Sequence, residues 1–544
     1  MSAAPAVGEL RCALIVATLT ARRAARSGAV WGLLFGLLIF NEAVTYHTSS
    51  PTPESRADIV RTFGDNTAFA AIIGPAHQLD TVGGFVSWRL LALLVWIGAI
   101  WGLLTATRLL RREEDAGRWE LLLAGRTTRS RATAQAIAGI AVGWSVLWAL
   151  SAALTVAAGS RSTVGFSTSG SLLYATAATA SAAMFLAIGA LTSQLAATRR
   201  QANGLAALVF AAAYLIRLVA DSVDGAGWLR WASPLGWIEE LQPLTGAQPL
   251  ALVPIALLVA GASGLAILLA GRRDAGAAML ARRAPVRART RLLDSSALLV
   301  VRLERWVALA WIGGLALAGA IFGITARSAA QGNVAVDEIE RTVGRLGAHP
   351  ASATAAWIGY EFLYLAALLT FAAAGQIAAT RGEEADGHLD HLLARPLDRR
   401  AWLAGRLGFG AVFVIAAALA TGLAAWAGIA GSGGLGLGPM LEAGLNLVPP
   451  ALLVLGLGTL LLGVAPRLAM PLLYTLVLWS FLIEIIGTSI TSSQWLLDTA
   501  LFTHVGPVPA AGLDWPAMGI LTGLGLIAAL AGLAAFAHRD LAAA

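Results

Sequence analysis

Two pairs of adjacent glutamates are the residues whose type and spacing first suggest chemistry in this chain. Glu113 and Glu114 form one pair, and Glu383 and Glu384 form the other. Two carboxylates can act together as general acid and general base, but neighbouring residues of a helix point about 100° apart, and the pattern implies no cleft. We therefore expect neither pair to be catalytic.

A metal site is the second kind of chemistry that this region suggests. Glu384, His388 and His391 have the spacing of residues on one face of a helix. The matching positions beside the first glutamate pair hold an arginine and a leucine in place of the two histidines. Because the ligand set is not kept between the two segments, we expect no metal.

The glutamate pairs belong to a block that occurs twice. A constant shift of 270 positions superimposes the copies, and Asp390 keeps the charge of Glu120. A second block repeats with a shift of 267, which matches Trp228 to Trp495. Duplication at fixed spacing indicates two similar halves. The identities of the first block are Arg111, Glu113, Glu114, Gly117, Leu122, Leu123, Ala124 and Arg129, matched by Arg381, Glu383, Glu384, Gly387, Leu392, Leu393, Ala394 and Arg399.

The composition indicates which environment surrounds these segments. Of the 544 residues, 58% are hydrophobic and 13% are charged, which is too little polar material to cover soluble domains. Apolar runs of roughly 20 residues recur, and each can cross about 30 Å of hydrocarbon as a helix. We predict an all-α integral membrane fold with about twelve transmembrane helices. An even number of spans in each half makes the two six-helix repeats parallel.

The predicted organisation has two repeats and a linker. Residues 1–271 form the first six-helix repeat, 272–296 a basic cytoplasmic linker, and 297–544 the second repeat. The spans are expected near 30–46, 86–110, 132–158, 172–197, 204–222 and 249–269, and near 306–326, 353–380, 402–429, 441–464, 469–489 and 517–536.

Arginine sets the expected orientation of the chain in the cell membrane. Arginines gather before the first predicted span and in alternate loops after it, and positive loops stay on the cytoplasmic side. Both termini are therefore expected in the cytoplasm. The net charge of +7 follows from this bias and from contact with anionic lipid, so we expect no nucleic-acid partner. The single cysteine, Cys12, allows no internal disulfide.

The repeated block lies in cytoplasmic loops, near 111–131 and 381–401. As a helix it would place Glu113, Gly117, Glu120 and Ala124 on one stripe with leucines alongside. Such a helix would lie on the membrane surface and offer apolar and acidic groups to a cytoplasmic partner. Glycine inside a helix costs roughly 0.5 to 1 kcal/mol, so its recurrence as Gly387 suggests a close backbone approach.

The block Arg-x-Glu-Glu-x-x-Gly, with Leu-Leu-Ala and Arg downstream, resembles the coupling-helix segment of ABC-2-type exporter permeases. The doubled twelve-span form resembles actinobacterial antibiotic-exporter permeases of the tetronasin-resistance kind. The resemblance implies a non-catalytic permease subunit that exports hydrophobic or amphiphilic antibiotics, drugs or lipids, and an amphipathic elbow at 8–26. It also implies contact with the ATPase subunit through Glu113, Glu114, Gly117, Glu120, Leu122, Leu123 and Arg129, and through Glu383, Glu384, Gly387, Asp390, Leu392, Leu393 and Arg399.

The sequence contains no lysine. A phosphate-binding loop requires Gly-x-x-x-x-Gly-Lys followed by Ser or Thr, so such a loop does not occur in this chain. Two docking segments imply two copies of a separate ABC ATPase, which would bind ATP and Mg²⁺. We expect no cofactor in this chain.

Charged residues inside the predicted spans are candidates for a translocation path or gate. Arg217 and Glu484 occupy equivalent positions, since 217 plus 267 is 484. An ionised group at the bilayer centre costs roughly 2.5 to 3.5 kcal/mol on insertion scales, so we expect the two to face each other, with snorkelling as the alternative. Arg89, Glu361 and Glu42 near outer helix ends are further gate candidates, with solvated helix ends as the alternative.

Two other classes of function compete with the exporter. A proton-coupled twelve-span secondary drug transporter also has parallel six-helix halves, although its loops after spans two and eight are usually short. A membrane-embedded transferase would need a polar catalytic cluster near the headgroups, and the sequence shows none.

Overall fold

The computed structural model describes most of the chain. The described residues are 15–49, 52–64, 70, 73–115, 117, 127–223, 225–272, 279, 292–293, 295–332, 352–385, 387–394, 397–430, 435–490 and 494–540. They form helices and connecting loops, with no strand among them. Eleven helices in these residues are long and apolar enough to cross a membrane, and a shorter apolar helix covers Ala469–Ile483. The prediction of an all-α membrane fold with about twelve helices is confirmed.

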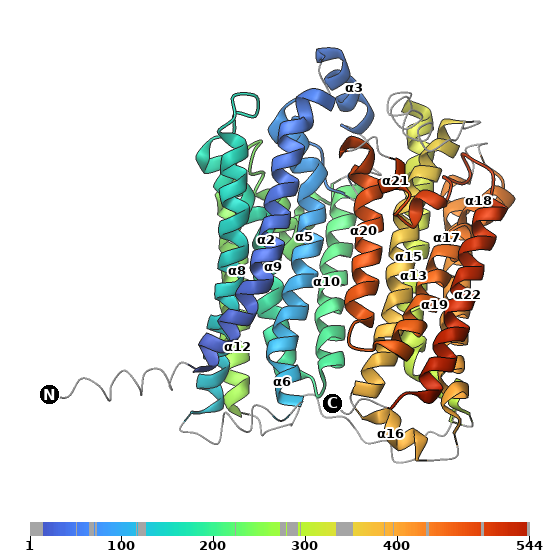
Figure 1. The fold of residues 1–544 in the computed structure, drawn as a ribbon. Helices are drawn as coiled ribbons and strands as arrows, with labels where there is room; N and C mark the ends of the chain where they lie inside the picture. The colour runs from blue at the N-terminus through green and yellow to red at the C-terminus, as the bar shows by residue number, and fades with distance from the viewer. Residues whose placement is uncertain are drawn as a thin grey trace. The chain divides into compact units, whose positions relative to one another are not determined.

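The chain forms two compact units, Met1–Ala284 and Pro285–Ala544. In each unit the long helices run side by side (Figure 1). The division falls within the stretch 272–296 that the sequence predicts to be a linker.

The first unit is built around α9, whose membrane-crossing window is 78% buried. α9 packs against α5, α8 and α12, and α2 packs along α8. A Cβ on Gly28 of α2 would lie 2.1 Å from the carbonyl oxygen of Gly143 of α8, so only glycine permits this approach. The elements are α2 (Ile15–Ser49), α3 (Pro53–Phe63), α5 (Val82–Leu109), α6 (Arg111–Asp115), α8 (Arg129–Gly159), α9 (Thr168–Leu195), α10 (Arg199–Ser222), η1 (Gly227–Ala232), α11 (Pro234–Glu240), η2 (Pro249–Ala251) and α12 (Leu252–Arg272).

The second unit repeats these pairings. α13 packs along α17 as α2 packs along α8, and α15 and α22 pack against α19 as α5 and α12 pack against α9. A Cβ on Gly456 of α19 would lie 1.9 Å from the carbonyl oxygen of Gly525 of α22. The elements are α13 (Ser296–Gly332), α15 (Ala353–Ala385), α16 (His388–Leu393), α17 (Arg399–Ile429), α18 (Leu437–Leu445), α19 (Val448–Val464), α20 (Ala469–Ile490), α21 (Gln494–Leu497), η3 (Phe502–His504) and α22 (Trp515–His538).

The start of the chain differs from the prediction of a separate elbow at 8–26. α2 runs without a break from Ile15 to Ser49, so the predicted elbow and the first span share one helix from Ile15 onward. The end of the predicted elbow, 21–26, consists of alanine and arginine, which favour helix, and no proline occurs between Ile15 and Ser49. The residues before Ile15 lie outside those described.

Candidate functional site

The repeated glycines form matching turns. Gly117 has φ +70 and Gly387 has φ +71, the left-handed conformation that favours glycine. The N–H of Gly117 donates to the carbonyl oxygen of Glu114 at 2.9 Å, and that of Gly387 donates to Glu384 at 3.1 Å. A Cβ at either glycine would meet nothing within 4 Å. Backbone conformation, and not close packing, is therefore the reason for glycine here.

The prediction of one continuous helix through each block is wrong. In the second copy, α15 ends at Ala385 and α16 begins at His388, with Gly387 between them. In the first copy, α6 ends at Asp115 before the turn at Gly117. The stripe that was predicted to run through the glycine is thus divided by a turn.

The glutamates beside these turns bind arginines of their own unit. In the second unit, Glu384 pairs with Arg539 at 2.6 Å and with Arg381 at 3.4 Å, and its side chain is only 4% exposed. Glu383 pairs with Arg406 of α17. These contacts join the end of α15 to the residue that follows α22 and to α17.

The first unit has corresponding contacts. Glu113 pairs with Arg23 of α2 at 3.1 Å, and Glu114 pairs with Arg111 at 3.2 Å. The Arg111 side chain is 2% exposed and donates to the carbonyl oxygen of Ala197 at 2.5 Å. In both units the glutamates therefore tie the repeated block to distant helix ends, and their contact with an ATPase remains a prediction.

The leucines of α16 face the interior of the second unit. Leu389 is 1% exposed and packs with Trp402 of α17 and Phe536 of α22, and Leu392 and Leu393 pack against the same cluster. The predicted apolar contact face is thus turned toward the chain's own helices.

The polar side of α16 is exposed: His388, Asp390 and His391 are the exposed residues of this helix. Arg399, at the start of α17, donates to the carbonyl oxygen of Arg539 at 3.0 Å. Arg129 begins α8. Glu120, Leu122 and Leu123 lie outside the described residues.

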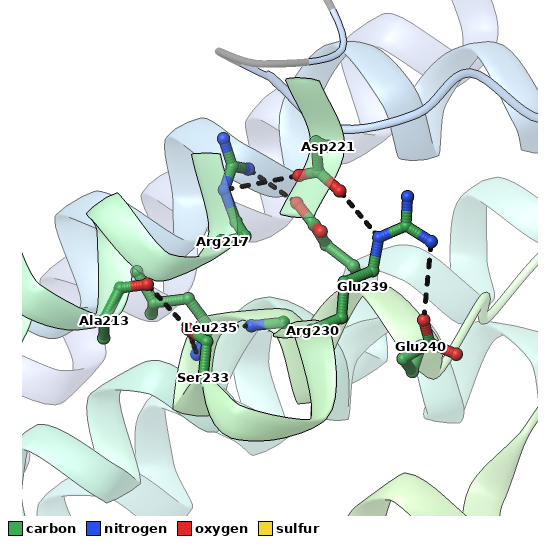
Figure 2. A network of polar contacts seen from close by, with 9 residues as sticks. Ala213, Arg217, Asp221, Arg230, Ser233, Leu235, Glu239 and Glu240 are labelled. Carbon is green, nitrogen blue, oxygen red and sulfur yellow. Dashed lines mark hydrogen bonds and ion pairs between the residues drawn. The ribbon is translucent and has the colours of Figure 1, made fainter. Parts of the chain in front are cut away.

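A second group of charged residues lies at the opposite ends of the first unit's helices, which the arginine distribution predicts to be outside. Arg217 Nη1 donates to Glu239 Oε1 at 2.6 Å, and its Nε lies 3.7 Å from Asp221 Oδ2 (Figure 2). Arg230 Nε donates to Asp221 Oδ1 at 2.6 Å, and its Nη1 lies 3.7 Å from Glu240 Oε1. The Arg217 side chain is 4% exposed and that of Asp221 is 0% exposed. We call these five residues the outer charge cluster.

A local fold-back brings the cluster together. After α10 the chain turns through η1 and returns as α11, so Arg230 and Glu239 meet the end of α10. Ser233 Oγ donates to the carbonyl oxygen of Ala213 at 2.7 Å and accepts the N–H of Leu235 at 3.2 Å, which caps α11 and fixes it to α10. A Cβ on Gly236 would lie 2.3 Å from the carbonyl oxygen of Arg230, so the turn requires glycine.

A cavity of about 60 Å³ adjoins the cluster. Arg217 and Glu239 form part of its wall, and Trp88, Trp96 and His77 line it as well. Burial raises the pKa of the Glu239 carboxyl, and the Arg217 guanidinium opposes this shift. Partial desolvation, aided by Arg230, lowers the pKa of His77. The cavity thus joins aromatic walls to a carboxyl group that holds its proton more tightly than usual.

A larger apolar cavity of about 540 Å³ lies between α8, α9 and α12. Its walls are mainly alanine, leucine, isoleucine and valine, with Trp144, Thr176 and Ser263. All three helices are among those that can cross a membrane. This cavity has the size and lining of a site for an apolar small molecule.

The structure places the other predicted gate residues as follows. Arg89 Nε and Glu42 Oε1 lie 3.2 Å apart, so these two form an ion pair between α5 and α2, in which Arg89 is 57% exposed. Glu361 is half-buried on α15. The side chain of Glu484 lies outside the described residues, so its predicted pairing with Arg217 stays a prediction. Within the first unit, Arg217 pairs with Glu239 and Asp221.

Sequence reasoning missed four members of the cluster: Asp221, Arg230, Glu239 and Glu240. Arg230 lies between Trp228 and Trp231 in the segment after α10, and Glu239 and Glu240 follow Trp237. A usable signal was present, because this short segment holds charges of both signs beside a charged residue of the preceding span.

The comparisons with known proteins agree with a membrane permease. The family model described as "Multidrug efflux system permease Rv1217c, C-terminal domain" matches residues 55–271 and 293–537. The chain is also similar to the multidrug efflux system permease protein Rv1217c of Mycobacterium tuberculosis (strain ATCC 25618 / H37Rv). The identity is 28% over 534 residues, which are 95% of this chain and 93% of the relative. Since the family match covers more than half of the chain, the chain belongs to this family of multi-pass membrane permeases.

Proposed function

We propose that this chain is the membrane subunit of an ATP-driven exporter, and that its two repeated blocks receive two copies of a separate ABC ATPase. The observation that carries the proposal is the matched pair of turns at Gly117 and Gly387. Each turn follows a glutamate pair in which at least one side chain binds an arginine outside its own helix: Glu113 binds Arg23 in the first unit, and Glu383 and Glu384 bind Arg406 and Arg539 in the second. Movement imposed on such a turn is transmitted directly to those elements.

The exposed side of α16 is the proposed contact with the ATPase. His388, Asp390 and His391 project from a helix whose leucines are anchored to α17 and α22. Because α16 packs on the membrane unit through its apolar side, a partner can bind its exposed polar side without separating the helix from that unit. The ATPase would supply the ATP and Mg²⁺ sites, because the sequence has no lysine for a phosphate-binding loop.

The cargo is proposed to be hydrophobic or amphiphilic. The apolar cavity between α8, α9 and α12 supports this class, because its walls offer few polar groups to a sugar or an inorganic ion. The relative's name as a multidrug efflux permease points the same way.

Co-purification tests the assignment. The full chain is co-expressed with a candidate ABC ATPase, and the ATPase retained on the tagged chain is measured after detergent extraction. We expect a stoichiometry of two ATPase copies per chain. A stable, drug-transporting chain that retains no ATPase under any nucleotide condition would overturn the proposal.

A proton-coupled drug transporter is the second candidate, favoured by one observation. The Glu239 carboxyl has a raised pKa beside a cavity at the predicted outer end, as a proton-binding group of such a transporter would. Transport that survives ATP depletion and stops on adding a protonophore would favour this candidate.

A further inference from the structure

The outer charge cluster has more carboxyl groups than arginines. Among the described residues it holds two arginines, Arg217 and Arg230, against three carboxylates, Asp221, Glu239 and Glu240. A buried group of charges is costly unless its members are compensated. His77 does not supply the missing positive charge at neutral pH, because its pKa is lowered. The cluster therefore calls for one further cation or proton.

Hydrogen bonding at the cavity is also incomplete. Glu239 uses Oε1 for Arg217, whereas its buried Oε2 has no hydrogen-bond partner among the described residues. The same holds for Ser87 Oγ, on the α5 side of the cavity. Buried polar atoms are nearly always satisfied by protein, water or ligand. A proton on Glu239 allows its carboxyl group to hydrogen-bond to Asp221, so the unpaired oxygen marks a position that a proton or a bound cation fills.

The walls of the cavity indicate which kind of cation fits. Trp88 and Trp96 line it, and the face of an indole ring attracts an ammonium group. A hard metal cation prefers six to eight oxygen ligands. The side-chain oxygens of this wall belong to four residues, Ser87, Glu239, Gln242 and Thr245, and most of the remaining wall is apolar. The volume of about 60 Å³ admits a head group with small substituents and leaves the rest of a larger molecule outside.

The cluster is not a requirement of the repeated fold. The shift of 267 that matches Trp228 to Trp495 places Thr488, Leu497 and Gly506 at the positions of Asp221, Arg230 and Glu239. The second repeat therefore forms its counterpart of this region, α21 and η3, without the equivalents of these three charges, and it has Glu484 at the position of Arg217. A feature present in only one of two similar halves is better explained by a function of that half.

We propose that the cavity between α5, α10 and α11 is a binding site for the ammonium group of an organic cation, with Glu239 as its counter-ion and Trp88 and Trp96 as its aromatic walls. This inference rests on the proposed function, because it names cationic amphiphiles as one class of exported compound. The binding itself needs no ATPase.

A proton occupies the site when the ammonium group is absent. Arg217 and Asp221 face Glu239 from α10, and Arg230 faces it from η1. Burial is the largest effect and raises the pKa of Glu239; the two arginines lower this pKa, and the charge of Asp221 and its hydrogen bond to Glu239 raise it. An entering ammonium group therefore displaces the Glu239 proton to solvent, so its affinity increases with pH.

Binding of choline to the purified full chain in lipid nanodiscs tests the proposal, with tryptophan fluorescence and calorimetry as readouts. The neutral carbon isostere 3,3-dimethyl-1-butanol is the matched probe. We expect saturable choline binding that strengthens from pH 6 to pH 9, and at least tenfold weaker binding of the isostere. Equal binding of the two probes would overturn the proposal.

Variants separate the site from the fold. Glu239→Gln is expected to weaken choline binding at least tenfold and to abolish its pH dependence, whereas Asp80→Asn, at an exposed carboxylate outside the cavity, leaves both unchanged. If Glu239→Gln does not fold, Trp88→Leu is used in its place. We expect Trp88→Leu to weaken the binding of choline and to leave the binding of the isostere unchanged. Unaltered choline binding in a folded Glu239→Gln or Trp88→Leu chain contradicts the site. ATPase co-purification is measured on the same samples. A loss of ATPase binding tests the proposed function, whereas a loss of choline binding tests the proposed site, so the two failures are distinguished.

Discussion

Arg539 and Glu384 are 155 positions apart in the sequence, yet their side chains form a bond of 2.6 Å. The bond links the residue after the last helix, α22, to the end of α15, directly before the Gly387 turn. Both side chains are largely buried. The last transmembrane helix and the proposed ATPase-docking segment of the second unit are therefore mechanically connected.

Removing this bond is expected to destabilise the second unit. Breaking a buried ion pair by removing one partner costs about 3 to 5 kcal/mol, because the other charge is left uncompensated. Glu384→Ala leaves both Arg539 and Arg381 in that state. We expect a clear drop in the Tm of the purified chain, and none for Asp390→Ala at an exposed position. Equal Tm values for the two variants would show that the bond does not support the fold.

The repeated glycines are expected to be sensitive to any side chain despite the open space around them. An L-residue in the left-handed region costs roughly 1 to 2 kcal/mol, so Gly387→Ala is expected to lower stability by about that amount. Gly387→Asn is expected to be milder, because asparagine tolerates this conformation. The matched control is Gly382→Ala, inside α15 and equally open, where alanine favours the helix. A Gly387→Ala chain as stable as Gly382→Ala would contradict the turn.

The polar side of α16 is expected to affect ATPase binding without affecting the fold. Asp390→Arg reverses a charge on the exposed side, so we expect less co-purified ATPase at an unchanged Tm. Leu389→Ala removes a side chain that is 1% exposed from the cluster with Trp402 and Phe536. Such core truncations cost about 2 to 5 kcal/mol, so this variant is expected to lower the Tm. If both variants reduce the Tm equally, the assignment of the apolar side of α16 to packing and of its polar side to ATPase contact is wrong.

Acidification is expected to weaken the predicted outer end of the first unit through His77. Its pKa is lowered in the folded protein, so the unfolded chain binds the proton more readily. The contribution of this residue to stability is complete above the unfolded value of about 6.5 and is lost as the pH falls through the lower folded value. When the pH is lowered from 7 to 5, the Tm of the His77→Asn variant should therefore fall less than the Tm of the unmodified chain. Parallel pH profiles would contradict this assignment.

The sequence supports the transmembrane fold better than the site, for physical reasons. Apolar runs such as 172–197 must be helical in lipid, and their length alone predicts α9. The reason for Gly387 was misjudged, because the residue type does not reveal whether a glycine meets a neighbour or adopts positive φ. Glu239 was missed because its burial depends on the fold-back that Ser233 fixes through Ala213, a contact that no periodicity encodes.

Drug uptake into inside-out vesicles tests the central claim most directly. The vesicles contain the chain with or without its ABC ATPase, and uptake of a fluorescent hydrophobic drug is followed after adding ATP. We predict uptake only when chain, ATPase and ATP are all present, insensitive to a protonophore and greatly reduced by Asp390→Arg. Full uptake by the chain alone on an imposed proton gradient would contradict the account.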